Sequence, residues 1–370
     1  MQWNWQHKQW PAFEYDSKQI SVFESSFLTH SGFLQGTFKH FDQEQKSQII
    51  VDWVTEEAYT SSKIEGELLD RESLQESVRC HFELSKSRRK IPAAEQGMVD
   101  VMVSLYENFS IQLTDAMLCT WQALILAGKS RRLHSLGQYR THAEPMRIIS
   151  GRAATPKIHY EAPPSHAVPQ EMAQFVRWFN TSSSLPLLTR AAIAHHYFVC
   201  IHPFEDGNGR IARALAEKAL SQGIGQPTII GLSQEIEREK DKYYDEALAL
   251  VNETLDITPW VLYFAETVIA AVAQTQNRLE FIIFQHKLFA KFDTSFNPRQ
   301  RKVIRKMFRA GPSGFRGGMS AENYLAITKT SRATATRDLQ QLVAWGVLTK
   351  RGERKHTRYD LITAAEFSVL

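Results

Sequence analysis

One short stretch of the chain carries most of the chemistry that the sequence indicates. It reads His202-Pro203-Phe204-Glu205-Asp206-Gly207-Asn208-Gly209-Arg210-Ile211-Ala212-Arg213. The residues from Ile211 to Leu220 favour a helix, so we expect Gly207, Asn208 and Gly209 to lie at a helix N-terminus, where three backbone N–H groups point together. A loop of this kind binds anions.

Two arginines in the same stretch also indicate that it binds an anionic ligand. Arg210 and Arg213 place positive charge in the first turn of the helix, where the helix dipole disfavours it unless an anion is bound. Asp206 offers an oxygen ligand to the Mg²⁺ that accompanies a nucleoside triphosphate, and the imidazole of His202 can accept a proton near neutral pH. Each residue alone is more often a turn or capping residue, but that reading explains the ordered set poorly.

The composition is that of a globular protein with more than one domain. The chain has 370 residues, of which 43% are hydrophobic and 23% are charged, and these values argue against extended disorder. The first residues lack the basic segment and apolar run of a signal peptide, and no apolar run approaches the length of a membrane span. The three cysteines are widely spaced, so neither a disulfide framework nor a zinc knuckle is indicated. We therefore expect a cytoplasmic protein without a membrane partner.

Most of the chain has the spacing of amphipathic helices. Apolar residues recur three and four positions apart in the segments 46–60, 92–108, 112–127, 169–180, 187–200 and 256–288. Residues 146–162 differ, because β-branched runs flank a glycine-containing turn there and two prolines follow. The sequence therefore predicts a mainly α-helical body with one β-hairpin.

The C-terminal segment differs from the rest in charge and in pattern. From Asn297 onward there are 15 Lys and Arg residues and 5 Asp and Glu residues, a net charge of +10, which leaves −6 for the preceding residues. Helices are expected from Pro298 to about Ala310, at 320–327 and at 332–345, and short strands at 347–349 and 357–361. This order is that of a winged helix-turn-helix domain.

The stretch that opens at His202 resembles the signature of the Fic family, His-Pro-Phe-x-Asp/Glu-Gly-Asn-Gly-Arg-x-x-Arg, and matches every fixed position. The resemblance covers about Ala58 to Glu266, and it implies a Fic-type helical body with a β-hairpin flap. The expected domains are an N-terminal helical region at 1–110, a Fic catalytic domain at 111–290 and the winged helix-turn-helix domain at 297–370.

The resemblance implies a protein adenylyltransferase, which transfers AMP from ATP to a Ser, Thr or Tyr hydroxyl of a target protein. His202 would be the general base, Asp206 would hold Mg²⁺, and Phe204 would be a buried anchor. The phosphate oxygens would be bound by the amides of Gly207, Asn208 and Gly209 and by the side chains of Arg210 and Arg213.

Other positions are assigned by the same resemblance. Gly209 is replaced by lysine in members that phosphorylate their targets, so this chain keeps the form that transfers AMP. Tyr243 and Tyr244 resemble positions that line the adenine pocket, although core packing explains one of them equally well. The hairpin at 146–162 resembles a flap that holds a target segment by strand addition, and the alternative is a plain surface hairpin. Self-modification and a homodimer are also expected.

An inhibitory motif precedes the signature. Ser61-Ser62-Lys63-Ile64-Glu65-Gly66 matches the pattern Ser/Thr-x-x-x-Glu-Gly/Asn of the self-restrained members of the family. Ser61 and Glu65 share one helical face. Glu65 would form a charge-assisted pair with Arg213 and occupy the space that a γ-phosphate needs. In the family the same glutamate also positions water to remove AMP from a modified target, and the sequence does not separate the two roles.

Two other functions compete with protein adenylylation. One is a nucleotide-sensing, DNA-binding transcription regulator, in which Arg332, Arg337 and the basic segment 350–358 contact DNA. The intact His202 and Asp206 count against a sensor without chemistry, and such a tail serves equally well for dimerisation or target docking. The other is a metal-dependent phosphohydrolase, for which further His and Asp ligands are lacking.

Overall fold

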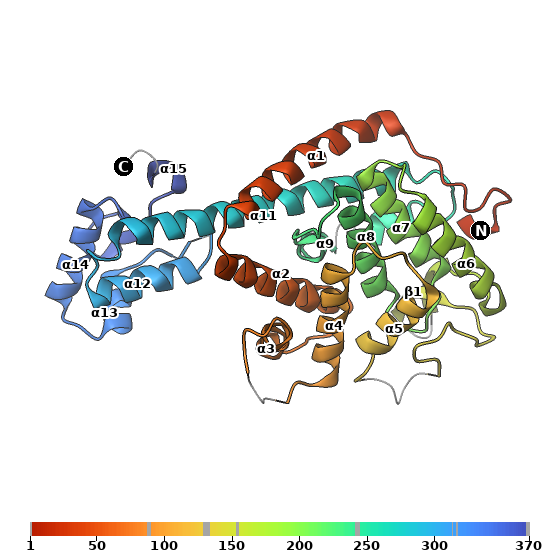
Figure 1. Ribbon diagram of the computed structural model, residues 1–370, viewed down its shortest axis with the longest axis horizontal. Coiled ribbons are helices and arrows are strands. Elements are labelled where there is room, and N and C mark those ends of the chain that lie inside the picture. The colour runs from red at the N-terminus through yellow and green to blue at the C-terminus, as the bar shows by residue number, and fades with distance from the viewer. Residues whose placement is uncertain are drawn as a thin grey trace. The chain divides into compact units, whose positions relative to one another are not determined.

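The computed structural model describes residues 2–86, 90–128, 134–152, 155–240, 245–312, 314, 315 and 317–367. The chain forms two compact units, Met1–Ala273 and Gln274–Leu370. Helices predominate in both, and the described strands form two sheets of two strands each (Figure 1). The predicted mainly α-helical class is therefore confirmed, whereas the domain limits at 1–110, 111–290 and 297–370 remain a prediction.

The first unit is built mainly of helices around a buried central pair. Its helices are α1 (Ser17–Lys39), α2 (Gln43–Ile64), α3 (Arg71–His81), α4 (Ala93–Glu107), α5 (Asp115–Ile125), α6 (Val168–Thr181), α7 (Leu187–Ile201), α8 (Asn208–Ile224), α9 (Leu232–Glu239) and α10 (Asp245–Ala249), and α11 (Thr258–Phe292) begins in it. The segments predicted from apolar spacing correspond to α2, α4, α5, α6, α7 and α11. Nearly every residue of α7 is buried, and α8 lies beside it (Figure 1).

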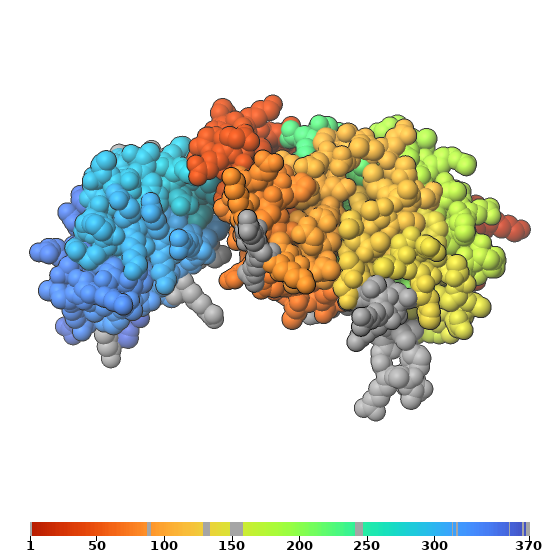
Figure 2. All heavy atoms as spheres, turned by 60° about the horizontal axis from the view of Figure 1, so that its bottom comes forward, coloured from red at the N-terminus to blue at the C-terminus, as the bar shows by residue number. Residues whose placement is uncertain are grey.

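Outer helices cover this central pair. Figure 2 shows one face of the molecule, on which the orange and yellow spheres of α3, α4 and α5 form much of the surface of the first unit. Helices α7 and α8 are largely buried, and the loop that joins them holds the signature residues. Within the described part of the chain, every helix falls short of the length or the apolar character that a membrane span requires.

Local signals in the sequence place the ends of the two helices that matter for the site. Asp42 and Gln45 form a reciprocal capping box that starts α2, with bonds of 2.8 and 3.0 Å. The helix ends at Ile64, so Glu65 lies directly at its C-terminus and Gly66 follows with φ +77°. The N-terminal boundary of α8 is Gly207, whose φ of +92° suits a residue without a Cβ.

The predicted hairpin is present. Strand β1 (Arg147–Arg152) pairs with β2 (Thr155–Glu161) in antiparallel register, with an irregularity between Ile148 and Ile149. The aromatic N-terminus packs against its base. The rings of Trp3 and Tyr160 are 5.4 Å apart, and the indole of Trp5 donates to the carbonyl of Glu161 at 2.7 Å.

The second unit has its own core. It contains the end of α11, then α12 (Pro298–Arg309), α13 (Ala321–Thr328), α14 (Arg332–Ala344), β3 (Leu348–Arg351), β4 (Arg358–Leu361) and α15 (Ala364–Phe367). Apolar side chains of α12 and α14, among them Val303, Ile304, Leu339 and Leu342, are buried together. The helices and strands lie where the sequence predicts them, and the assignment as a winged helix-turn-helix domain remains a prediction.

Candidate active site

His202 is held at the end of α7 with one ring nitrogen free. It closes the helix with left-handed backbone angles, φ 49° and ψ 58°, and its N–H donates to the carbonyl of Phe198 at 3.0 Å. The ring Nδ1 lies 3.2 Å from the carbonyl of Val199. Because a carbonyl only accepts, Nδ1 carries the proton and Nε2 keeps its lone pair. Burial lowers the pKa of His202 to about 4, so the imidazole is neutral at pH 7.

The loop between α7 and α8 is closed by its own side chains. The amide group of Asn208 donates to the carbonyl of Phe204 at 2.8 Å and accepts from its N–H at 3.0 Å. Phe204 is fully buried, as expected for an anchor. The N–H groups at the start of α8, beginning with Asn208 and Gly209, have no acceptor within the helix because of their position. They form the end of α8 to which an anion is attracted.

Gly207 differs from its two neighbours. Its N–H donates to a carboxylate oxygen of Asp206 at 2.6 Å. The sequence predicts that this amide binds phosphate, and in the present conformation it holds Asp206 instead. The side chain of Asp206 is 44% exposed, and the bond to Gly207 fixes the orientation of its carboxylate toward the loop.

Arg213 is occupied by the end of α2. Its side chain is 1% exposed. Its Nε donates to the hydroxyl of Ser61 at 3.0 Å, one Nη donates to the carbonyl of Ser61 at 2.7 Å, and the other Nη pairs with a carboxylate oxygen of Glu65 at 2.9 Å. The structure thus brings together the three side chains that the inhibitory pattern connects.

The carboxylate of Glu65 lies at the N-terminal turn of α8. A Cβ added to Gly209 would collide with its Oε1 and would lie 3.3 Å from Nη1 of Arg213. Desolvation acts to raise the pKa of Glu65, but Arg213, Arg210 and Lys240 together hold it below its ordinary value. A negatively charged group therefore occupies the place where the helix end and the arginines favour an anion.

A second carboxylate, that of Glu67, holds Arg210. Nη1 of Arg210 lies 2.6 Å from Oε2 of Glu67, and Nη2 lies 3.5 Å from Oδ1 of Asp206. The side chain of Arg210 is also 1% exposed. The inhibitory pattern ends at Gly66, so it gives no signal for Glu67. Its importance follows only from the way α2 lies against α8.

The site has one carboxylate that suits a hard cation. Within the described residues no group of three or more His, Cys, Asp or Glu side chains could hold a metal ion. Mg²⁺ does not need such a group, because it is commonly bound by one or two carboxylates, water and the phosphates of its nucleotide. The half-exposed carboxylate of Asp206, beside the N-terminus of α8, fits that kind of binding.

Two predicted site residues lie outside the described residues. These are Tyr243 and Tyr244, which the sequence assigns to the adenine pocket, and their place in the structure is therefore not described. The hairpin is described except for residues 153 and 154, and Ile148 and Ile158 are exposed on it at 39% and 36%.

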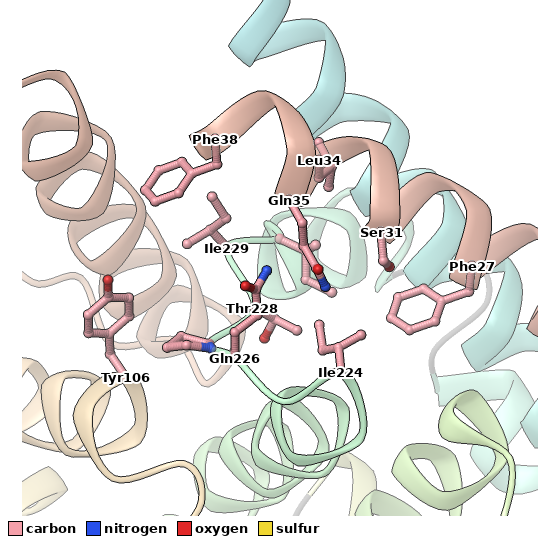
Figure 3. A pocket seen from close by; sticks show the side chains of 12 residues that line it. Phe27, Ser31, Leu34, Gln35, Phe38, Tyr106, Ile224, Gln226, Thr228 and Ile229 are labelled. Atoms are coloured by element: carbon pink, nitrogen blue, oxygen red, sulfur yellow. The ribbon is translucent and has the colours of Figure 1, made fainter. Parts of the chain in front are cut away.

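A separate pocket lies between α1, α4 and the segment that joins α8 to α9. Its open space is about 570 Å³, and Figure 3 shows Phe27, Phe38, Tyr106 and Ile224 among the side chains that line it. None of the residues from His202 to Arg213 contributes to its wall. We assign it no part in the chemistry of the signature loop.

Comparison with known proteins agrees with this geometry. Residues 112–220 match the Fic/DOC family, and residues 3–84 match a domain of unknown function, DUF4172. Over 97 residues the chain is 42% identical to proteins of Drosophila melanogaster and Drosophila sechellia that are named protein adenylyltransferase Fic. That stretch is 26% of this chain and 18% of each relative, so the chain matches less than a fifth of their length.

The overall fold is shared with a solved structure. A Fic family protein from Desulfovibrio desulfuricans G20 aligns over 96% of this chain and 97% of its own, with a TM-score of 0.55 and 18% sequence identity. Fold and site together define a helical protein in which His202, at the end of α7, lies beside the N-terminus of α8. The chain contains a Fic/DOC family domain at residues 112–220.

Proposed function

We propose that this protein transfers AMP from ATP to a Ser, Thr or Tyr hydroxyl of a target protein. The observation that carries the proposal is the neutral imidazole of His202 next to the N-terminus of α8 and two buried arginines. The names of the relatives, protein adenylyltransferase Fic, support the same reaction. The test is mass spectrometry of the intact Glu65→Gly variant after incubation with Mg-ATP, since addition of one adenylyl unit identifies the reaction.

The proposed chemistry gives a role to the histidine, the aspartate and the two arginines of the signature loop. Nε2 of His202 takes the proton of the target hydroxyl, whose oxygen forms a bond to the α-phosphorus while the bond to the β-phosphate oxygen breaks and pyrophosphate leaves. The first amides of α8, Arg210 and Arg213 bind the phosphates and stabilise their charge. Asp206 would hold Mg²⁺, which neutralises phosphate charge when bound.

We also propose that the end of α2 restrains this reaction. Glu65 and Ser61 bind Arg213, and Glu67 binds Arg210, so a carboxylate of the protein itself pairs with each of the two arginines proposed to bind phosphate. ATP must compete with these carboxylates for the same guanidinium groups. Removal of AMP from a modified target, with Glu65 positioning water, remains a second proposed role. A homodimer and a cytoplasmic location remain predictions.

The low pKa of His202 predicts an unusual pH profile. A pKa depressed to about 4 leaves the base form populated at acidic pH. Glu65 acts to raise this pKa, so the Glu65→Gly variant should keep it low. Between pH 8 and pH 5.5, the rate at saturating Mg-ATP should stay nearly constant. An ordinary imidazole, with a pKa of about 6.5, would lose about tenfold over this range. A tenfold decline centred near that value would contradict the prediction.

A second candidate function concerns the basic C-terminal segment. Arg332 and Arg337 of α14 are exposed, whereas Asp338 is buried and bound to Arg299 at 2.8 Å and to the hydroxyl of Tyr324 at 2.9 Å. The acidic residue of α14 thus faces inward and the basic residues face solvent. This arrangement favours contact with nucleic acid phosphates, alongside the net charge of +10.

We expect DNA binding by this segment to weaken steeply with salt. In a shift assay, the logarithm of the association constant falls linearly with the logarithm of the salt concentration. This slope should become shallower by about 0.9 for each phosphate contact removed. Arg332→Ala combined with Arg337→Ala should therefore weaken DNA binding and make its salt dependence less steep. Lys8→Ala with Lys18→Ala removes the same charge from exposed positions of the first unit and should change neither. Absence of a shift at low salt would favour a protein-docking role.

A further inference from the structure

Arg140 lies between the signature loop and the segment that follows the hairpin. Its side chain is 1% exposed. Its donors reach the carbonyl of His202 at 2.8 Å, the carbonyls of Ile201 and Pro163 at 3.3 and 2.5 Å, and the hydroxyl of Ser165 at 2.9 Å. Its backbone N–H also donates to the carbonyl of Pro203 at 2.9 Å. All five acceptors are uncharged, and three of them are the consecutive carbonyls around His202.

These carbonyls need donors. The last carbonyls of a helix have no partner within it, and α7 ends at Ile201 in the interior of the unit. His202 then adopts a left-handed conformation that residues other than glycine adopt unfavourably. The guanidinium of Arg140 binds the carbonyls of Ile201 and His202 and fixes their direction. Because a side chain follows its backbone, this also fixes the direction of the imidazole.

We propose that Arg140 is a positioning residue for AMP transfer, which binds the backbone around His202 and so holds Nε2 where it can accept the proton of the target hydroxyl. The inference rests on the proposed function. Arg140 does not touch the reacting atoms and acts through His202. Ser165, which it also binds, donates to the carbonyl of His142 at 2.6 Å, so Arg140 ties the end of the hairpin to the same loop.

The charge of Arg140 gives a second, separate effect. Arg140 lowers the pKa of His202, whereas Glu65 and Asp206 raise it. Loss of the guanidinium should therefore raise that pKa, whereas loss of a buried arginine far from His202 should not.

The test compares variants in the full chain that carries Glu65→Gly. Arg140→Gln should lower kcat by about 100-fold, the effect of a displacement of about 1 Å in a catalytic group. The dissociation constant of ATP should change little, and the acid limb of the pH profile should move to higher pH. Arg140→Lys keeps the charge but cannot bind all the carbonyls, so it should lower kcat and leave the acid limb in place. If Arg140→Gln does not fold, Arg140→Lys carries the test.

A matched control is available in Arg190. It is also buried, and it donates to the carbonyls of Phe179 and Ala219 and to the hydroxyl of Ser182. None of these lies in the signature loop. Arg190→Gln should lower stability and leave kcat and the pH profile of the folded protein unchanged. The proposal is overturned if Arg140→Gln and Arg190→Gln change kcat and the pH profile to the same extent. It is also overturned if kcat is unchanged in Arg140→Lys.

A measurement without turnover separates this inference from the proposed function. If the Glu65→Gly parent transfers no AMP, the pKa of His202 is measured by NMR titration of histidine-labelled protein, with its signal assigned by His202→Ala. A proton that moves from Nδ1 to Nε2 in Arg140→Gln but not in Arg190→Gln supports positioning by Arg140. A proton that stays on Nδ1 in Arg140→Gln overturns it.

Discussion

Glu65→Gly is expected to raise the rate of AMP transfer by about 10- to 100-fold. A hydrogen bond to a charged group contributes about 1.5 to 3 kcal/mol, and that range corresponds to this factor in rate or affinity. In the present conformation Arg213 is buried and bound by Glu65 at 2.9 Å, so we expect a nucleotide phosphate to compete with Glu65 for Arg213. Removing the carboxylate leaves the guanidinium and the end of α8 for the nucleotide.

The measurement needs no knowledge of the target. The full chain is incubated with Mg-ATP, and incorporation is followed by the intact mass and by labelled ATP, because self-modification reports the reaction. Glu237→Gln is the control, since it breaks the exposed pair between Lys63 of α2 and Glu237 of α9 at 2.6 Å without touching either arginine. It should leave incorporation unchanged. Equal incorporation by the parent chain and Glu65→Gly would contradict the restraint.

The sequence predicts those parts of the site whose residues are neighbours along the chain. The loop from His202 to Arg213 is contiguous, so its histidine, glycines and arginines are seen together. Ser61 and Glu65 are four residues apart on one helix, and their spacing alone places them on one face. Their joint contact with Arg213 was expected only through the resemblance to the Fic family, because the two segments are far apart in the sequence.

The parts that were missed depend on packing between distant segments. Glu67 is 143 residues from Arg210, and Arg140 is 62 residues from His202. Glu67 belongs to no local pattern. Arg140 ends the stretch Gly137-Gln138-Tyr139-Arg140, which resembles the family's lead into the flap and to which the sequence assigns no catalytic role. Both contacts depend on packing between distant segments. Helix α1 was also not predicted, although Ile20, Phe27 and Leu34 recur seven positions apart and are buried on one face. Glu24 contributes to its place in the fold by accepting bonds from the N–H groups of Leu188 and Thr189.

His202→Ala in the Glu65→Gly background should lower AMP transfer by about 100- to 10,000-fold, the usual contribution of a general base. ATP binding should persist, because the arginines and the end of α8 do not depend on the imidazole. The ring's contact with Val199 is its only hydrogen bond to the described residues, so its removal should change the loop little. Single-turnover transfer and the ATP dissociation constant are measured on the same preparations.

The left-handed backbone of His202 allows a sharper version of this test. Asparagine adopts such a conformation more readily than alanine, so His202→Asn should keep the loop at least as well while removing the base. Loss of transfer in both variants, with ATP binding intact, assigns the loss to the missing imidazole and not to a collapsed loop. A protein that only senses nucleotide should be unaffected by either change in its binding of ATP and DNA. Transfer that survives in both variants at the rate of Glu65→Gly would show that the proton is accepted elsewhere.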